Sequence, residues 1–158
     1  MDWTIVSVVI GGVLAAASGI VTTWFQYRHE RKALVQAFAG EIGAITAIIR
    51  RRNYLGQLEG LLDCLKRGRP VVPKKMAAQS YFRIYEANAG RIGLMPRGQA
   101  DDIARFYTFA ISLIEDVTTN RPDGADVDAA VRFLSELMGM LRELLELGDS
   151  IILRLNIK

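Results

Sequence analysis

The sequence contains one cysteine, one histidine and four prolines, and the first two scarcities exclude whole classes of chemistry. With Cys64 as the single thiol, neither an internal disulfide nor a paired-cysteine redox or zinc motif can form. With His29 as the single histidine, a histidine metal cluster and an ordinary Ser–His pair beyond that residue are excluded. No glycine-rich loop ending in Gly-Lys-Ser/Thr occurs. The sequence therefore predicts no catalytic residue, no metal site and no cofactor.

Charge is absent from the segment Trp3–Phe25, which runs for 23 residues. A helix of that length measures roughly 34 Å, against a bilayer hydrocarbon core of about 30 Å. Trp3 stands at one end and Trp24 and Tyr27 at the other, as is typical of side chains at the lipid–water interface. The pattern predicts a transmembrane helix, with residues 1–27 as a membrane anchor and residues 28–158 as a separate domain.

Two alternatives for this segment fit less well. A cleaved signal peptide needs Lys or Arg before a shorter apolar run, and none precedes this one, although Ala15-Ala16-Ala17 offers a cleavage site. A core helix without a polar face needs a larger protein around it than the remaining residues supply.

Charge on the two sides of the segment predicts its orientation. Asp2 precedes it, whereas Arg28, Arg31 and Lys32 follow it, and Lys and Arg favour the cytoplasmic side. Residues 26–75 carry 11 Lys and Arg against 4 Asp and Glu, which suits the anionic inner leaflet. We expect the amino terminus outside and residues 26–158 in the cytoplasm.

Small residues recur at every fourth position of the apolar segment, on one face of the expected helix. Such a face lets two helices approach closely, although Gly and Ala are also common in membrane helices generally. The pattern predicts a helix–helix contact in the membrane, with a second copy or another membrane protein. The positions are Ser7, Gly11, Ala15, Gly19 and Thr23.

The remaining chain predicts an all-α fold, in which the transmembrane helix is followed by a cytoplasmic helical bundle of about four helices. Apolar residues follow helical spacing throughout and no convincing two-residue alternation occurs. Whether the first helix continues through Arg50–Asn53 is left open. The later helices are expected over 55–65 with a stop at Gly68, from Ser80 to about Ala89, over 98–119, and over 126–156.

One acidic residue and three glycines in these helices lead to further predictions. Glu41 is expected at a solvated edge, or else beside a buried partner such as an arginine. Gly40 and Gly43 weaken their helix or allow another helix to approach. Gly148 interrupts the heptad seam of the last helix.

Basic residues cluster around one helix break and one loop. They are interpreted in one of two ways. They are either solvent-exposed residues of connecting segments, or a patch that contacts lipid headgroups or a nucleic acid. Nucleic acid is not the expected partner, because anionic lipid suffices to explain the basic half. The residues are Arg50, Arg51, Arg52, Lys66, Arg67, Arg69, Lys74 and Lys75.

The stretch Tyr85–Pro96, followed by Phe106-Tyr107 and preceded by the flank Tyr27–Arg31, resembles a set of short bacterial proteins with an amino-terminal membrane helix and a helical cytoplasmic part. The resemblance implies the bacterial inner membrane as location, and since that set has no assigned activity, no catalytic residue carries over. Physically, the stretch predicts a helix corner in which Gly90 ends one helix and Pro96 opens the next. Its Gly90-Arg91-Ile92-Gly93 also matches the GxxG loop of nucleic-acid-binding KH domains, but that fold needs strands.

These observations favour a non-enzymatic, single-pass membrane protein that acts as an interaction or scaffold module, or as an accessory subunit, at the inner face of the membrane. Its partners would be membrane lipid and either a second copy or another membrane protein, with no small-molecule substrate. One alternative is a membrane effector that oligomerises through the transmembrane helix. A lesser one is a membrane-tethered nucleic-acid binder.

Overall fold

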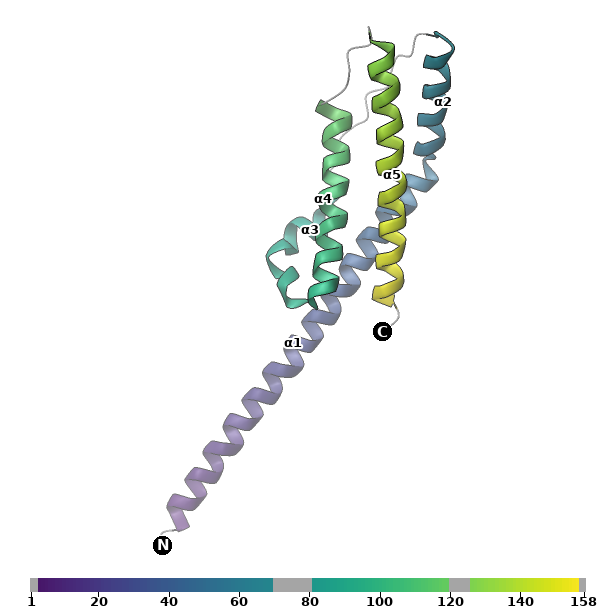
Figure 1. The fold of residues 1–158 in the computed structure, drawn as a ribbon. Helices are drawn as coiled ribbons and strands as arrows, with labels where there is room; N and C mark the ends of the chain where they lie inside the picture. Colours follow the sequence, from purple (N-terminus) through teal and green to yellow (C-terminus); the bar gives the residue numbers. More distant parts are fainter. Residues whose placement is uncertain (1–2, 70–80, 120–125, 157–158) are drawn as a thin grey trace.

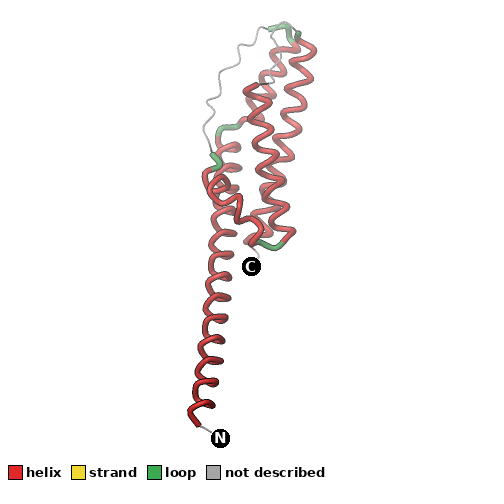
Figure 2. Tube along the Cα trace, turned by 90° about the vertical axis from the view of Figure 1, so that its left-hand side faces the viewer, coloured by secondary structure: helices red, strands yellow, loops and turns green. Residues whose placement is uncertain are grey.

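The computed structural model describes residues 3–69, 81–119 and 126–156, with side chains from residue 17 to residue 155. All regular elements in these ranges are helices, which confirms the all-α class. Beyond the first helix, the described residues contain four further α-helices and one short 3-10 helix. They pack into an elongated body, and the N-terminal half of the first helix projects away from it (Figures 1 and 2).

Helix α1 (Trp3–Arg51) is continuous over 49 residues and therefore roughly 70 Å long. It joins the uncharged segment to the body without a break, because no proline or helix cap interrupts it. Its second half buries Leu34, Phe38, Ile42 and Ile45, as the helical spacing predicts. One helix thus serves both as the projecting arm and as part of the core.

The question left open at Arg50–Asn53 is answered by the backbone. Helix α1 ends at Arg51, and Asn53 adopts a left-handed conformation with φ 48° before α2 (Tyr54–Lys66) begins. Asparagine tolerates this conformation better than most residues. The bend lets α2 run alongside the last helix, α5 (Val127–Asn156), instead of continuing the line of α1 (Figure 1).

The predicted stop of α2 at Gly68 is confirmed in atomic detail. Gly68 has φ 67°, and its N–H donates to the Leu65 carbonyl at 2.9 Å. The Arg69 N–H donates to the Cys64 carbonyl at 3.0 Å. This pair of bonds is the Schellman motif, in which glycine supplies the left-handed residue.

The helix corner differs from the prediction. Helix α3 (Arg83–Asn88) is followed directly by the 3-10 helix η1 (Ala89–Leu94), so Gly90 does not end the helical run. The backbone of Gly90 is not left-handed, and a tightened helix continues through it. Pro96 does open α4 (Arg97–Thr119), because its carbonyl accepts the N–H groups of Gln99 and Ala100. The expected cap at Ser80 lies outside the described residues.

Helix α5 is the central element of the body. It contacts α1, α2 and α4 along its length, and it starts after Asp126, whose carboxylate accepts the Ala129 N–H at 2.9 Å. One ion pair joins it to each of these neighbours. The pairs are Asp149 with Arg50 of α1, Arg142 with Glu59 of α2, and Arg154 with Asp102 of α4.

Gly148, expected to interrupt the seam of α5, lies within it. The residue is buried where α1, α4 and α5 meet, and a Cβ atom there would stand 2.6 Å from Thr46 Cγ2 and 3.0 Å from Phe106 Cε2. The close approach of helices expected at Gly40 or Gly43 occurs here instead. A Cβ on Gly40 would contact nothing within 4 Å, and one on Gly43 would meet Ile152 at an ordinary 3.8 Å.

Candidate functional site

The projecting part of α1 exposes an apolar surface. Every residue from 17 to 30 is exposed, and among them Ile20 is 71% and Trp24 53% accessible. Large apolar side chains in such a contiguous run are unusual on a surface that faces water. Helix α1 is long and apolar enough to cross a membrane, a property that core helices and signal sequences also have. The apolar window that meets this criterion is 33% buried, whereas every residue from 17 to 30 is exposed, so this exposed part is what differs from a core helix.

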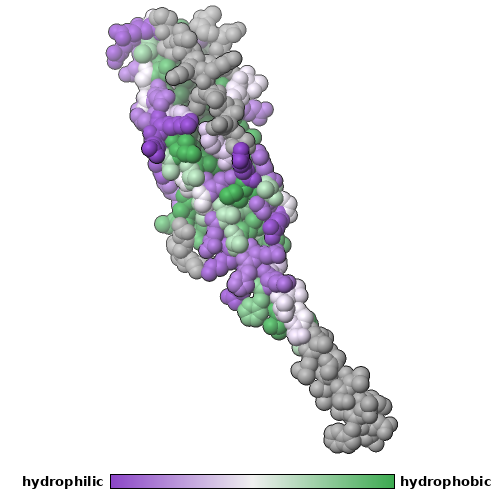
Figure 3. Space-filling model, turned by 180° about the vertical axis from the view of Figure 1, so that it is seen from behind, coloured by the Kyte–Doolittle hydropathy of each residue, from purple (hydrophilic) through white to green (hydrophobic). Residues whose placement is uncertain are grey.

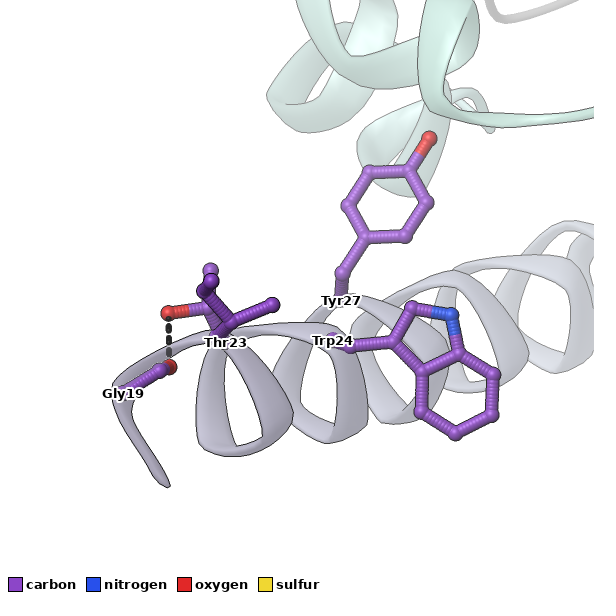
Figure 4. Close-up of a pocket in the computed structure, with 5 residues that line it drawn as sticks. Gly19, Thr23, Trp24 and Tyr27 are labelled. Atoms are coloured by element: carbon purple, nitrogen blue, oxygen red, sulfur yellow. Dashed lines mark hydrogen bonds between the residues drawn. The ribbon is translucent and has the colours of Figure 1, made fainter. Parts of the chain in front are cut away.

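Two of the predicted small residues line a shallow hollow on this surface. Gly19 and Thr23 form it together with Ile20, Trp24 and Tyr27 (Figure 4). The Thr23 hydroxyl donates to the Gly19 carbonyl at 2.9 Å, so its hydrogen-bonding need is met within the helix. The hollow is therefore mainly apolar, and the Thr23 hydroxyl in it needs no hydrogen-bond partner from outside the helix. Both properties suit a surface that packs against another helix in a membrane. Ser7, Gly11 and Ala15 lie on the same helix, but their side chains are outside the described residues.

Charge begins directly after the apolar surface. Figure 3 shows hydrophilic residues gathered where α1 enters the body, next to the apolar residues of its projecting part. Arg28 lies over the Trp24 ring, with its guanidinium carbon 5.2 Å from the ring centroid. Lys32 is exposed and Arg31 is half-buried, and neither forms an ion pair with a described residue.

The helix corner contacts the same stretch of α1 at two points. The Tyr27 hydroxyl donates to the Leu94 carbonyl of η1 at 3.3 Å. Arg91 of η1 forms an ion pair with Glu30 at 3.0 Å. These contacts join segments more than 60 residues apart in the chain, so periodicity alone could not predict them.

The structure divides the predicted basic patch among separate partners. Arg50 pairs with Asp149, and Arg67 pairs with Asp63 at 3.5 Å. The Arg52 guanidinium donates to the Tyr54 hydroxyl at 2.8 Å. Arg51, Lys66 and Arg69 are exposed, whereas Lys74 and Lys75 lie outside the described residues. Two of the six described members are thus paired with carboxylates.

Glu41 is the polar residue whose role sequence reasoning missed. It is 8% accessible, not at a solvated edge, and its partners do not include an arginine. Its Oε1 accepts the Ile84 N–H at 2.7 Å, and its Oε2 accepts the Tyr85 N–H at 3.0 Å and the Tyr107 hydroxyl. The sequence feature that could have predicted its burial is its position on the same face of α1 as the buried residues Phe38, Ile42 and Ile45.

Aromatic rings surround this carboxylate. Tyr107 stacks on Tyr85 with ring centroids 4.1 Å apart and meets Phe38, Phe82 and Phe106 edge to face. Burial raises the pKa of Tyr107, and its hydrogen bond to the Glu41 carboxylate raises it further. The cluster fixes α3 on α1 and α4, so we interpret it as architectural.

The raised pKa of Tyr107 predicts a loss of stability in alkali. In the unfolded chain tyrosine loses its proton near pH 10, whereas buried Tyr107 retains it. The folded state then binds more protons, so the free energy of unfolding falls above about pH 10, by up to about 1.4 kcal/mol per pH unit. Melting curves in detergent from pH 8 to 11 measure this. Y107F should reduce the slope, and an unchanged slope would contradict the assignment.

The described residues contain no group of three His, Cys, Asp or Glu side chains that could hold a metal ion. Cys64 is half-buried on α2 and His29 is exposed on α1. Comparison of the chain with protein-family models, curated proteins and solved structures finds no match.

Proposed function

We propose that the chain is a single-pass membrane protein that acts, without enzymatic activity, as an interaction module or accessory subunit at the inner face of a bacterial membrane. The observation that supports this best is the continuity of α1. Its apolar N-terminal part projects from the body, with every residue from 17 to 30 exposed, and its other half belongs to the core. A hydrocarbon environment would cover the exposed side chains, and the helix would transmit any association in the membrane to the body.

The proposed orientation places the amino terminus outside and the body in the cytoplasm. The basic residues Arg28, Arg31 and Lys32 support it, because they follow the apolar half of α1. Alkaline carbonate extraction should leave the protein in the membrane pellet. A C-terminal reporter enzyme active only in the cytoplasm should be active, and activity of a periplasmic reporter instead would reverse the orientation.

Helix association through the small-residue face is the proposed activity of the membrane segment. Replacing Gly11 and Gly19 with leucine fills that face, and we expect self-association to weaken by about tenfold or more, because the two backbones can no longer approach closely. Energy transfer between labelled copies in vesicles measures the change.

The matched control is the pair Val13→Leu and Val21→Leu. Each lies two residues further along α1, about 200° around the helix from the glycines, and ends as the same leucine side chain on the other face of the helix. Equal loss of association in both double variants, or in neither, would contradict a contact through this face.

The first experiment is purification of the tagged full-length protein from its native membranes in a mild detergent, with mass spectrometry of the intact particle. A stoichiometric second protein supports the accessory-subunit form of the proposal. A pure oligomer of this chain favours the alternative of a membrane effector, which leakage of dye from vesicles would then test. Sedimentation as a monomer without any partner contradicts both.

A further inference from the structure

The η1 corner lies at the depth where lipid headgroups would be if α1 crosses a membrane. Tyr27, which binds the Leu94 carbonyl, is three residues beyond Trp24, and Glu30, which binds Arg91, is six residues beyond it. At about 1.5 Å per residue these positions lie roughly 4.5 and 9 Å further along the helix axis. The headgroup layer on each side of a bilayer is about 5–8 Å thick. With Trp24 at the hydrocarbon boundary, Leu94 therefore lies within the headgroups and Arg91 near their outer edge.

The charges at this end of the body are mainly basic. Arg97, the first residue of α4, has no ion pair among the described residues, as is true of Arg31 and Lys32. Lys32 and Arg97 are exposed, whereas Arg31 is half-buried.

The carboxylates at the same end are mostly neutralised. Glu30 pairs with Arg91, and Asp102 pairs with Arg154 at 2.6 Å. Asp101 is exposed on the first turn of α4 and remains as an acidic side chain there.

We infer that the corner Ala89–Arg97, together with Arg28–Lys32 of α1, forms a docking face for anionic lipid headgroups. This inference rests on the proposed membrane anchor and adds a second contact to it. One helix alone would let the body swing over the bilayer. Two contacts on different elements, joined by the Tyr27–Leu94 hydrogen bond and the Arg91–Glu30 ion pair, hold it at one angle. Since α4 starts and α5 ends at this side of the body, both would stand with these ends toward the membrane (Figure 1).

The test places a fluorophore on the corner of the full-length protein in lipid nanodiscs. Gly93→Cys in a Cys64→Ser background is suitable, because Gly93 is exposed and a side chain there meets nothing within 4 Å. Gly60→Cys on α2 has the same open surroundings and serves as the matched distal control. The quencher is a lipid with a nitroxide on its headgroup, in discs of phosphatidylcholine or of phosphatidylcholine with phosphatidylglycerol.

We expect the Gly93 label to be quenched at least about twofold more strongly than the Gly60 label, with stronger quenching in the anionic discs. Arg97→Glu should remove the anionic enhancement, and because Arg97 has no partner in the described residues, this change leaves the packing of η1 intact. Equal quenching of the two labels, or equal quenching in the two disc types, would overturn the inference.

A second readout separates failure of this inference from failure of the membrane anchor. In a Trp3→Phe variant, Trp24 is the remaining tryptophan, and lipids brominated near the top of the acyl chain should quench it. Quenching of Trp24 without quenching of the Gly93 label leaves the anchor in place and removes the docking face. Absence of Trp24 quenching removes both.

Discussion

Replacing Glu41 with alanine is expected to lower the free energy of unfolding by about 3–5 kcal/mol, and the melting temperature by roughly 10 °C or more. The loss is large because three buried donors depend on one carboxylate: the Ile84 and Tyr85 N–H groups and the Tyr107 hydroxyl. A buried donor without an acceptor keeps its full desolvation cost. Thermal unfolding of the full-length protein in mild detergent, followed by circular dichroism, measures it.

Glutamine at position 41 gives a sharper test of the same network. Each carboxylate oxygen accepts a backbone N–H, so either orientation of the amide turns its NH2 group toward a donor. Glu41→Gln should therefore cost about 2 kcal/mol although the volume is unchanged. Glu30→Gln on the same helix removes an exposed ion pair and should cost under about 1 kcal/mol. Equal effects at the two positions would refute a structural role for Glu41.

Replacing Gly148 with alanine is expected to destabilise the protein by about 1–2 kcal/mol, although alanine normally favours a helix by about 1 kcal/mol. The new Cβ would overlap Thr46 Cγ2 and press on Phe106, both of which are buried. Thr46 cannot rotate away without losing its hydrogen bond to the Gly43 carbonyl at 3.0 Å. Helices α1 and α5 would therefore have to separate.

Gly139→Ala is the matched control, because Gly139 is exposed on the same helix and a Cβ there meets nothing within 4 Å. We expect this variant to gain about 0.5–1 kcal/mol. Adding Thr46→Ser to Gly148→Ala removes Cγ2 but keeps the hydroxyl, and should restore part of the lost stability. Stabilisation by Gly148→Ala alone would show that the helices cross at a greater distance than the structure has.

Sequence patterns predicted the helices well because the interactions that start, stop and orient a helix act between residues close together in the chain. The αL glycine at position 68, the carboxylate cap at Asp126 and the three- and four-residue spacing of Leu34, Phe38 and Ile42 act within one or two turns of chain. Gly90 failed as a stop for the same kind of reason. Glycine permits a left-handed residue but does not require one, and the chain tightened into a 3-10 helix instead.

The helical fold class follows from the sequence alone, as does the presence of one helix long and apolar enough to span a membrane. The roles of Glu41, Gly148 and the η1 corner become visible in the packed structure. Glu41 takes its partners from α3 and α4, Gly148 is confined by α1 and α4, and η1 reaches Tyr27 and Glu30 from across the chain. Each role depends on atoms brought together by packing, which the periodicity of a single helix does not encode.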